Sequence, residues 1–250
     1  VLFDAGYSDA FVQNAAKLGV DLTRITQIVL SHGHDDHTRG LPALFALGDF
    51  RSVPLTAHPD CFWPKRSEGL AIGMPYSAEA LAERVDLRLV RTPQRISEHL
   101  IFLGEIPRMF DFEASYAMGE RLRDGIWGQI SHESTDGLFI ITGCSHSGIC
   151  NIIEYAKRVC SNARIAGVIG GFHLFADDKR LAQTVDHLAA QNMTHAYPCH
   201  CVSLIAKAKM LSAGLPVEEV GVGMAIEIAK NNDRDKNCHG RCAFSGGGKE

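Results

Sequence analysis

The heptapeptide Ser31-His32-Gly33-His34-Asp35-Asp36-His37 directly follows a run, residues 25–30, that is rich in β-branched side chains and typical of a buried strand. Three imidazoles and two carboxylates within six residues contribute little to packing, and bunched histidines repel one another when protonated. Neutral imidazole and carboxylate are, however, the ligands that Zn²⁺ and Fe²⁺ prefer. An ordinary surface is the simpler explanation for two close histidines, but the density of this run favours a metal site.

On both sides of this motif, strand-like segments alternate with segments whose apolar residues recur at helical spacing. We expect strands at residues 1–4, 25–31, 53–58, 138–144, 164–170 and 195–199, and a last strand at 217–228. Helices are expected behind Ser or Asp caps at residues 8–18, 148–159, 177–191 and 202–212. The alternation predicts an α/β fold in one domain, residues 1–230.

The middle of the chain, residues 59–135, is less regular and is expected to be an insertion near the site, with short strands at 87–90 and 101–103. Its polar side chains either reach the site opening or form a solvated surface; they are Arg121, Arg123, Asp124, His132 and Glu133. Residues 231–250 are polar and are expected to be a mobile tail. The tail motif Cys238-His239-Gly240-Arg241-Cys242 has no second CxxC partner, so it is a weak zinc or cluster signal.

Composition excludes several classes of protein. The chain has 250 residues, of which 46% are hydrophobic, and its net charge of -4 comes without a basic block, so we expect no nucleic-acid partner. No apolar run approaches the roughly 18 residues of a membrane helix and no leader precedes the first strand, which predicts a soluble cytoplasmic protein without a membrane partner. The eight cysteines are expected to be reduced thiols. Oligomeric state is left open.

The motif His32-x-His34-x-Asp36-His37 behind a hydrophobic strand resembles the signature of the metallo-β-lactamase superfamily. Residues 2–6, 142–149, 170–174 and 198–201 resemble one branch, which includes proteins labelled as dihydropterin ribofuranosyl-aminobenzene phosphate synthases and many metal-dependent hydrolases. The resemblance covers residue 1 to about residue 228. It implies a four-layer αββα sandwich with the metals at one edge between the two sheets. The hairpin that normally precedes the first strand is expected to be missing.

The same resemblance implies two groups of metal ligands. His32, His34 and His146 would hold one metal, whereas Asp36, His37 and His200 would hold the second, and Asp4 would support the ligands from outside. The residues give independent support, because His146 and His200 each follow an apolar run, where strand ends gather ligands; the alternative for either is a loop histidine with ordinary hydrogen bonds. His173 stands where the superfamily usually has a bridging Asp, so it is either a ligand or a residue facing the substrate.

The expected cofactors are two divalent metal ions, zinc with manganese or iron as alternatives. A divalent metal lowers the pKa of bound water from about 15.7 to near 7, so we expect a metal-bound hydroxide, oriented by Asp36, to attack a small phosphorylated or ester-like substrate. The turn holding Ser145 and Ser147 opens an expected helix, whose backbone N–H groups and the two hydroxyls would receive a phosphate.

Two further interpretations remain open. The branch suggests a synthase acting on a pterin diphosphate, and thiols crowding the site suggest a metal-bound sensor or a redox partner. Cys144 stands two residues before His146. Cys199 and Cys201 flank His200 and are expected to point away from it into the packing. The remaining histidines without companion ligands are expected to be structural; they are His58, His99, His187 and His195.

Overall fold

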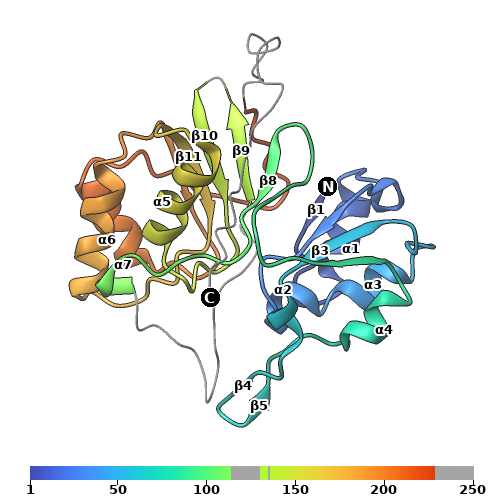
Figure 1. Cartoon of the computed structure of the whole chain (residues 1–250). Coiled ribbons are helices and arrows are strands. Elements are labelled where there is room, and N and C mark those ends of the chain that lie inside the picture. Colours follow the sequence, from blue (N-terminus) through green and yellow to red (C-terminus); the bar gives the residue numbers. More distant parts are fainter. Residues whose placement is uncertain (114–129, 135, 229–250) are drawn as a thin grey trace, which may run out of the picture.

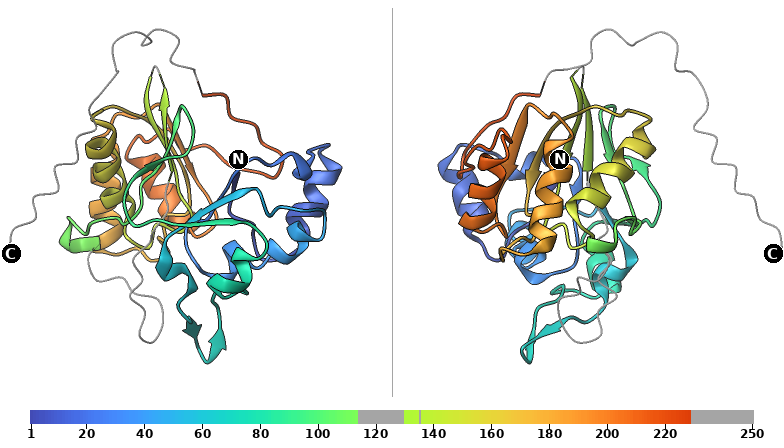
Figure 2. Two further views of the ribbon diagram at one scale, coloured as in Figure 1. Left: turned by 45° about the vertical axis from the view of Figure 1, so that its right-hand side comes forward. Right: turned by 90° about the vertical axis from the view of Figure 1, so that its left-hand side faces the viewer.

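Two β-sheets pack face to face in this computed structural model, which describes residues 1–113, 130–134 and 136–228. Helices cover the outer face of each sheet, so the layers follow the order helix, sheet, sheet, helix (Figures 1 and 2). The expected αββα sandwich is therefore confirmed. Arg121, Arg123, Asp124, Cys238 and Cys242 lie outside the described residues.

The first sheet is entirely parallel, because each of its strands is joined to the next through helical segments. Its strands, in spatial order, are β1 (Leu2–Phe3), β2 (Ile28–Val29), β3 (Pro54–Ala57) and β6 (Asp86–Leu89). The outer helices of this half are α1 (Ala10–Lys17), α3 (Leu41–Phe45) and α4 (Ala78–Ala82), with 3₁₀ turns η1 (Leu22–Arg24) and η2 (Pro59–Phe62) between elements.

The second sheet is mixed. Its strands, in spatial order, are β12 (His195–Pro198), β11 (Ile165–Gly170), β10 (Gly137–Ile141), β9 (Ile130–Ser134), β8 (Leu100–Phe102) and β7 (Gln94–Arg95). The first three are parallel and the last three form an antiparallel meander. Its helices are α5 (Ile149–Cys160), α6 (Lys179–Ala189) and α7 (Leu204–Ser212), and a 3₁₀ turn, η3 (Asp111–Glu113), precedes the undescribed residues 114–129.

Helix α5 shows why these segments fold as they do. Its apolar residues recur every three or four positions and are buried on one face, as with Ile149, Ile152 and Ile153. Lys157 and Arg158 lie in the last turn, where cations interact favourably with the helix dipole. The helix ends at Ser161, which has the left-handed conformation. Helices α6 and α7 begin at side-chain caps, with Asp178 accepting from the backbone of Leu181 and Ser203 from that of Ala206.

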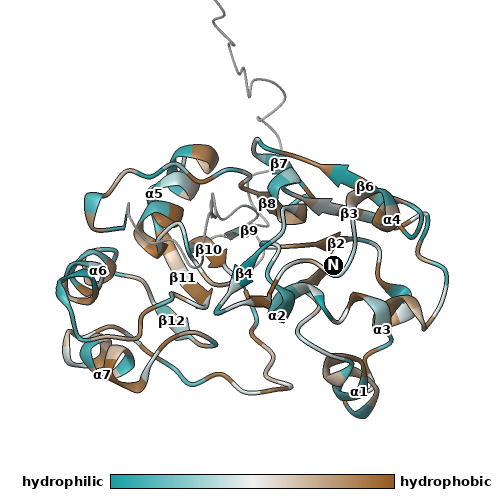
Figure 3. Cartoon of the chain, turned by 90° about the horizontal axis from the view of Figure 1, so that it is seen from below, coloured by the Kyte–Doolittle hydropathy of each residue, from teal (hydrophilic) through white to brown (hydrophobic). Residues whose placement is uncertain are grey.

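Three hydrophobic clusters follow the layers. The largest lies between the second sheet and helices α5, α6 and α7, and another lies between the first sheet and helices α1, α3 and α4. A small cluster built around Val29 and Phe102 fills the space between the two sheets. The short helix α2 (Asp35–Thr38) lies between the two halves when the chain is seen from below (Figure 3).

The structure corrects two expectations. Residues 217–228 form no strand: only Val217 pairs, through one isolated bridge to Ala196, and the rest of the segment is largely exposed and interrupted by Gly221 and Gly223. Residues 59–113 and 130–134 are also more than an insertion, because they complete both sheets with β6, β7, β8 and β9. The hairpin of β4 (Arg66–Ser67) and β5 (Leu70–Ala71) projects from the body (Figures 1 and 2).

Within the described residues, no helix combines the length and the apolar character that crossing a bilayer requires.

Candidate metal centre

The carboxyl ends of five parallel strands meet at one place between the sheets. Asp4 follows β1, residues 31–37 follow β2, residues 144–147 follow β10, His173 follows β11 and His200 follows β12. Open parallel sheets gather ligand-binding residues at this edge, because each strand ends there in a loop. The sequence therefore delivers histidines from four separate loops to one site.

Backbone conformation at these loop positions is unusual. Asp4, Ser145, His173 and His200 all have positive φ, between 49° and 57°. A non-glycine residue in the left-handed region costs on the order of 1–3 kcal/mol, and Asp and His tolerate it better than most residues. Four such residues at a single edge indicate that the surrounding structure holds them in place for the sake of the side chains they carry.

Gly33 explains how His32 and His34 can project into the same site. A Cβ atom at Gly33 would lie 2.0 Å from the carbonyl oxygen of Cys61, so no larger residue fits between the two histidines. The loop after β10 packs as closely, since a Cβ at Gly143 would lie 2.2 Å from the Ser31 hydroxyl. Close backbone packing therefore draws the two histidine-bearing loops together.

Three imidazoles form what we call the inner cluster: His32, His34 and His146. Nδ1 of His34 lies 3.0 Å from Nε2 of His32 and 3.1 Å from Nε2 of His146. All three residues are at most 6% exposed. Burial, the largest cause, lowers the pKa of His34 to about 4 and the pKa values of His32 and His146 well below their usual range. The inner cluster thus presents neutral imidazoles.

Asp4 determines which nitrogen of His32 carries the proton. The Ser31 hydroxyl donates to Oδ2 of Asp4 at 2.6 Å, so it must accept from Nδ1–H of His32, 2.8 Å away. The lone pair of His32 is then on Nε2, which faces His34. Asp4 also receives the Ser31 backbone N–H at 2.7 Å, which secures the start of the loop.

A second group, which we call the outer cluster, consists of Asp36, His37 and His200. Oδ2 of Asp36 lies 3.0 Å from Nε2 of His200 and 3.6 Å from Nε2 of His37. Nδ1 of His37 donates to Asp4 at 2.7 Å, which leaves the lone pair on Nε2, 3.1 Å from the sulfur of Cys144. Asp4 therefore orients one imidazole in each cluster.

The electrostatics of the outer cluster differ from those of the inner one. The hydrogen bond with Asp36 raises the pKa of His200. Burial lowers the pKa of His37, but the charges of Asp4 and Asp36 outweigh it and the net shift is upward. Burial raises the pKa of Asp36, yet the bond with His200 and the charges of the histidines bring it below its usual value. The Asp36 carboxylate thus remains ionised.

Cys144, which the sequence placed among the thiols near the site but not among the metal ligands, lies in the site. Its sulfur lies 3.1 Å from Nε2 of His37, and the residue is 3% exposed. Ligand atoms of the described residues converge within 4.8 Å of one another in three groups: Asp36, His37, Cys144 and His200; His32, Cys144 and His146; and His32, His34 and Asp36. All six histidine and aspartate ligands implied for the two metals therefore recur in these groups, together with one thiol.

His173 is placed beside the inner cluster without joining it. Its ring centroid is 4.5 Å from that of His146, and burial, the largest cause, lowers its pKa to about 4. It belongs to none of the three groups of converging ligand atoms among the described residues. The backbone N–H of His173 donates to the sulfur of Cys201 at 3.3 Å. Its assignment as a ligand stays a prediction.

The turn after β10 differs from the expected phosphate site. Glu113 is 1% exposed and accepts from the backbone N–H groups of Cys150 and Asn151 at the start of α5, at 3.1 and 2.9 Å. A carboxylate of the chain therefore already holds these two N–H groups of α5, and a phosphate site on the turn of residues 145–148 stays a prediction. Ser145 and Ser147 are fully buried, and the Ser145 hydroxyl lies 2.7 Å from that of Thr142. Their role in substrate binding stays a prediction.

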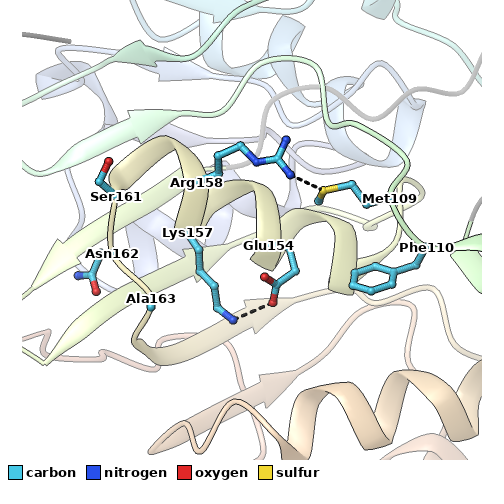
Figure 4. A pocket seen from close by; sticks show the side chains of 8 residues that line it. All are labelled: Met109, Phe110, Glu154, Lys157, Arg158, Ser161, Asn162 and Ala163. Carbon is cyan, nitrogen blue, oxygen red and sulfur yellow. Dashed lines mark hydrogen bonds and ion pairs between the residues drawn. The ribbon is translucent and has the colours of Figure 1, made fainter. Parts of the chain in front are cut away.

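A surface pocket beside the second half of α5 and the residues that follow it offers a useful contrast (Figure 4). Its cavity of about 610 Å³ is lined by Met109, Phe110, Glu154, Lys157, Arg158, Ser161, Asn162 and Ala163. Lys157 pairs with Glu154 at 2.7 Å, and Arg158 donates to the sulfur of Met109 at 3.1 Å. Its lining contains no histidine or cysteine, so it lacks the ligands typical of a zinc centre.

Comparison with known proteins gives one family match and two similar sequences. Residues 1–98, which include β1 and residues 31–37, match the model of the metallo-β-lactamase superfamily. An uncharacterised protein of Methanocaldococcus jannaschii is 33% identical over 218 residues, 84% of this chain and 82% of that protein. The 7,8-dihydropterin-6-methyl-4-(β-D-ribofuranosyl)-aminobenzene-5′-phosphate synthase of the same organism is 29% identical over 226 residues, 83% of this chain and 76% of the synthase.

One solved structure has a similar fold. The crystal structure of a metal-dependent hydrolase of the β-lactamase superfamily superposes with a TM-score of 0.78 at 25% identity, covering 91% of this chain and 88% of that one.

Proposed function

This chain belongs to the metallo-β-lactamase superfamily, and from that premise we propose that it is a metal-dependent hydrolase acting on a small, phosphorylated or ester-like substrate. The observation that carries the proposal is the convergence of six ligands from three strand ends, whose contacts define the inner and the outer cluster. Imidazole and carboxylate in this number suit two divalent cations, zinc first, with manganese or iron as alternatives.

The inner cluster fits a cation on its own chemistry. Tetrahedral zinc with Zn–N bonds of 2.0–2.1 Å separates its ligand nitrogens by about 3.3 Å, close to the 3.0 and 3.1 Å found here. Neutral imidazoles cannot all satisfy one another around a single Nδ1 atom, whereas a cation accepts every lone pair. We assign the second cation to Asp36, His37 and His200, whose ligand atoms lie together with one ionised carboxylate.

The chain's own residues then have distinct tasks. Bound divalent cations would supply Lewis acidity, lowering the pKa of water toward neutrality and polarising the substrate oxygen. Asp36 holds its negative charge at neutral pH and lies partly exposed, so it accepts a hydrogen bond from the attacking water and orients it. Asp4 keeps the proton on Nδ1 of His37 and thereby keeps the Nε2 lone pair available.

Substrate is expected to approach from the outer cluster. The side chains of Asp36 and His200 are 37% and 44% exposed, whereas the inner histidines are closed off from solvent. A phosphate or ester oxygen arriving from that side meets the outer cluster first, with the inner cluster behind it.

A second candidate is a pterin-diphosphate-dependent synthase. The specific observation in its favour is the 29% identity to the dihydropterin synthase over most of both chains. Both candidates need cations that stabilise charge on phosphate or ester oxygens, and they differ in whether water or an organic acceptor takes the transferred group.

An activity panel with metal analysis tests the proposal. The purified chain, loaded with zinc, manganese or iron, is assayed with a phosphodiester, a lactone, and a pterin diphosphate with its aminobenzene acceptor. The matched variants are His34→Ala in the inner cluster and His195→Ala, an exposed histidine that contacts Glu218. We expect hydrolysis that is lost in His34→Ala and kept in His195→Ala. Turnover that survives His34→Ala contradicts the proposal, and coupled product from pterin diphosphate without hydrolysis favours the synthase.

A further inference from the structure

Cys144 lies at the junction of the two clusters. Its sulfur is grouped with Asp36, His37 and His200 on one side and with His32 and His146 on the other, in each case with all ligand atoms within 4.8 Å of one another. Among the described residues, no other side chain belongs to one group containing His146 and another containing His200. A single sulfur atom is thus within reach of both proposed cation positions.

The backbone holds this sulfur in place. Cys144 follows Gly143, whose carbonyl accepts the backbone N–H of Gly171 at 2.7 Å. The carbonyl of Cys144 itself receives the thiol of Cys201 at 3.7 Å. With 3% exposure, the side chain has no path to turn away into solvent. Its position is a consequence of the same loop packing that delivers His146.

The charge of the site gives the sulfur a role. The histidine ligands are neutral when they bind a cation, and Asp36 is the one carboxylate among the converging ligand atoms of the described residues. Two divalent cations bring four positive charges against that single negative charge. Unbalanced charge in a buried site is costly, so a second anionic ligand between the cations would stabilise both.

We propose that Cys144 binds as a thiolate between the two cations, an inference that rests on the metal site of the proposed function. On binding, the thiol proton leaves to solvent and a metal–sulfur bond forms, without oxidation or reduction. Metal-bound thiols are deprotonated outright. A soft thiolate also sharpens the choice of metal, since sulfur favours zinc over manganese and magnesium.

X-ray absorption of the zinc-loaded wild-type protein tests this without any substitution. Zinc–sulfur bonds of about 2.3 Å are distinct from zinc–nitrogen bonds of 2.0–2.1 Å. We expect a sulfur shell at zinc, and in the cobalt-loaded protein a thiolate-to-cobalt charge-transfer band in the near ultraviolet. The matched pair of variants is Cys144→Ser and Cys201→Ser, two buried thiols of one neighbourhood, of which only Cys144 joins the groups of ligand atoms.

Loss of the sulfur shell in Cys144→Ser but not in Cys201→Ser, with at least about 10-fold weaker binding of one metal equivalent, supports the proposal. If Cys144→Ser does not fold, a sulfur shell that persists when each of the other seven cysteines is replaced singly by Ser supports it by elimination. Zinc bound through nitrogen and oxygen only, or a sulfur shell lost in Cys201→Ser, overturns it while leaving the metal site intact. A protein that binds no metal at all contradicts the proposed function itself.

Discussion

The inner and outer clusters lie side by side, yet burial makes them different kinds of site. The inner one consists of three buried imidazoles whose pKa values are lowered, so they are neutral and ready for a cation. The outer one contains an ionised carboxylate and two histidines whose pKa values are raised, and two of its three members are open to solvent. In the absence of metal the carboxylate of the outer cluster pairs with its histidines, whereas the inner cluster is uncharged.

We therefore expect the two clusters to have different roles in one site. A buried cluster of neutral ligands is suited to hold a cation firmly, since no proton competes for its lone pairs near neutral pH. An exposed, proton-binding cluster is suited to exchange ligands with substrate. The following experiments test that division.

The largest effect is expected from His34→Ala compared with His200→Ala. Removing His34 deletes the atom on which the inner nitrogens converge, so we expect metal affinity there to fall by more than about 100-fold and activity to reach background. His200→Ala should lower the occupancy of one equivalent and leave the other bound. Metal quantification after dialysis distinguishes them; equal losses in both variants would show that the clusters are not separable.

Acidification should empty the outer cluster first. Protons compete with cations for imidazole nitrogen, and the raised pKa values of His37 and His200 bring that competition to higher pH than at His34, whose pKa is about 4. Metal content measured at equilibrium from pH 8 downward should therefore fall in two steps. A single step would remove the distinction.

The same pKa shifts predict how the stability of the metal-free protein depends on pH. Raised pKa values at His37 and His200 contribute stability below about pH 6.5, which is lost as pH rises through their folded-state values. The lowered pKa of His34 acts oppositely and removes stability as pH falls from about 6.5 toward 4. Urea unfolding of the metal-free chain against pH measures the sum.

Asp4→Asn should weaken both clusters at once, because Asp4 orients His37 directly and His32 through Ser31. The amide has one acceptor oxygen where the carboxylate has two, so one of these bonds is lost. We expect roughly 10- to 100-fold weaker metal binding in a protein that still folds. Asp49→Asn, at an exposed carboxylate paired with Arg51, is the control. An effect confined to one equivalent would show that Asp4 does not join the clusters.

The smallest effects concern the helix caps behind each cluster. Glu113→Ala removes the carboxylate that caps α5, next to the loop of His146, and should cost about 2 kcal/mol of unfolding free energy. Ser203→Ala removes the cap of α7, next to the loop of His200, and should cost about 1 kcal/mol. The loss of stability in the two variants is compared by thermal unfolding. A larger loss in Ser203→Ala than in Glu113→Ala would contradict the expectation that the more deeply buried cap stabilises the protein more.

Much of the fold follows from local patterns. The six main strands and four long helices were predicted within a few residues, because apolar periodicity and Ser or Asp caps act over short distances. The strand predicted at residues 217–228 is absent because a local pattern does not show whether a partner strand is available. The apolar residues suggest a strand, but in this segment only Val217 pairs with a strand of the sheet, at Ala196. Strand β7 was not predicted, because Gln94 and Arg95 are both polar and show no apolar alternation.

The candidate ligands could likewise be recognised from local sequence, because they are polar residues that directly follow apolar strands. What the sequence determined by itself was therefore the chemistry available: histidines and carboxylates at strand ends, in a motif specific enough to indicate the superfamily. Only the tertiary structure decided that Cys144 lies between the clusters, that Glu113 fills the start of α5, and that one cluster is buried while the other is open. Distances and burial depend on how loops far apart in the chain pack against one another, and no local pattern contains that information.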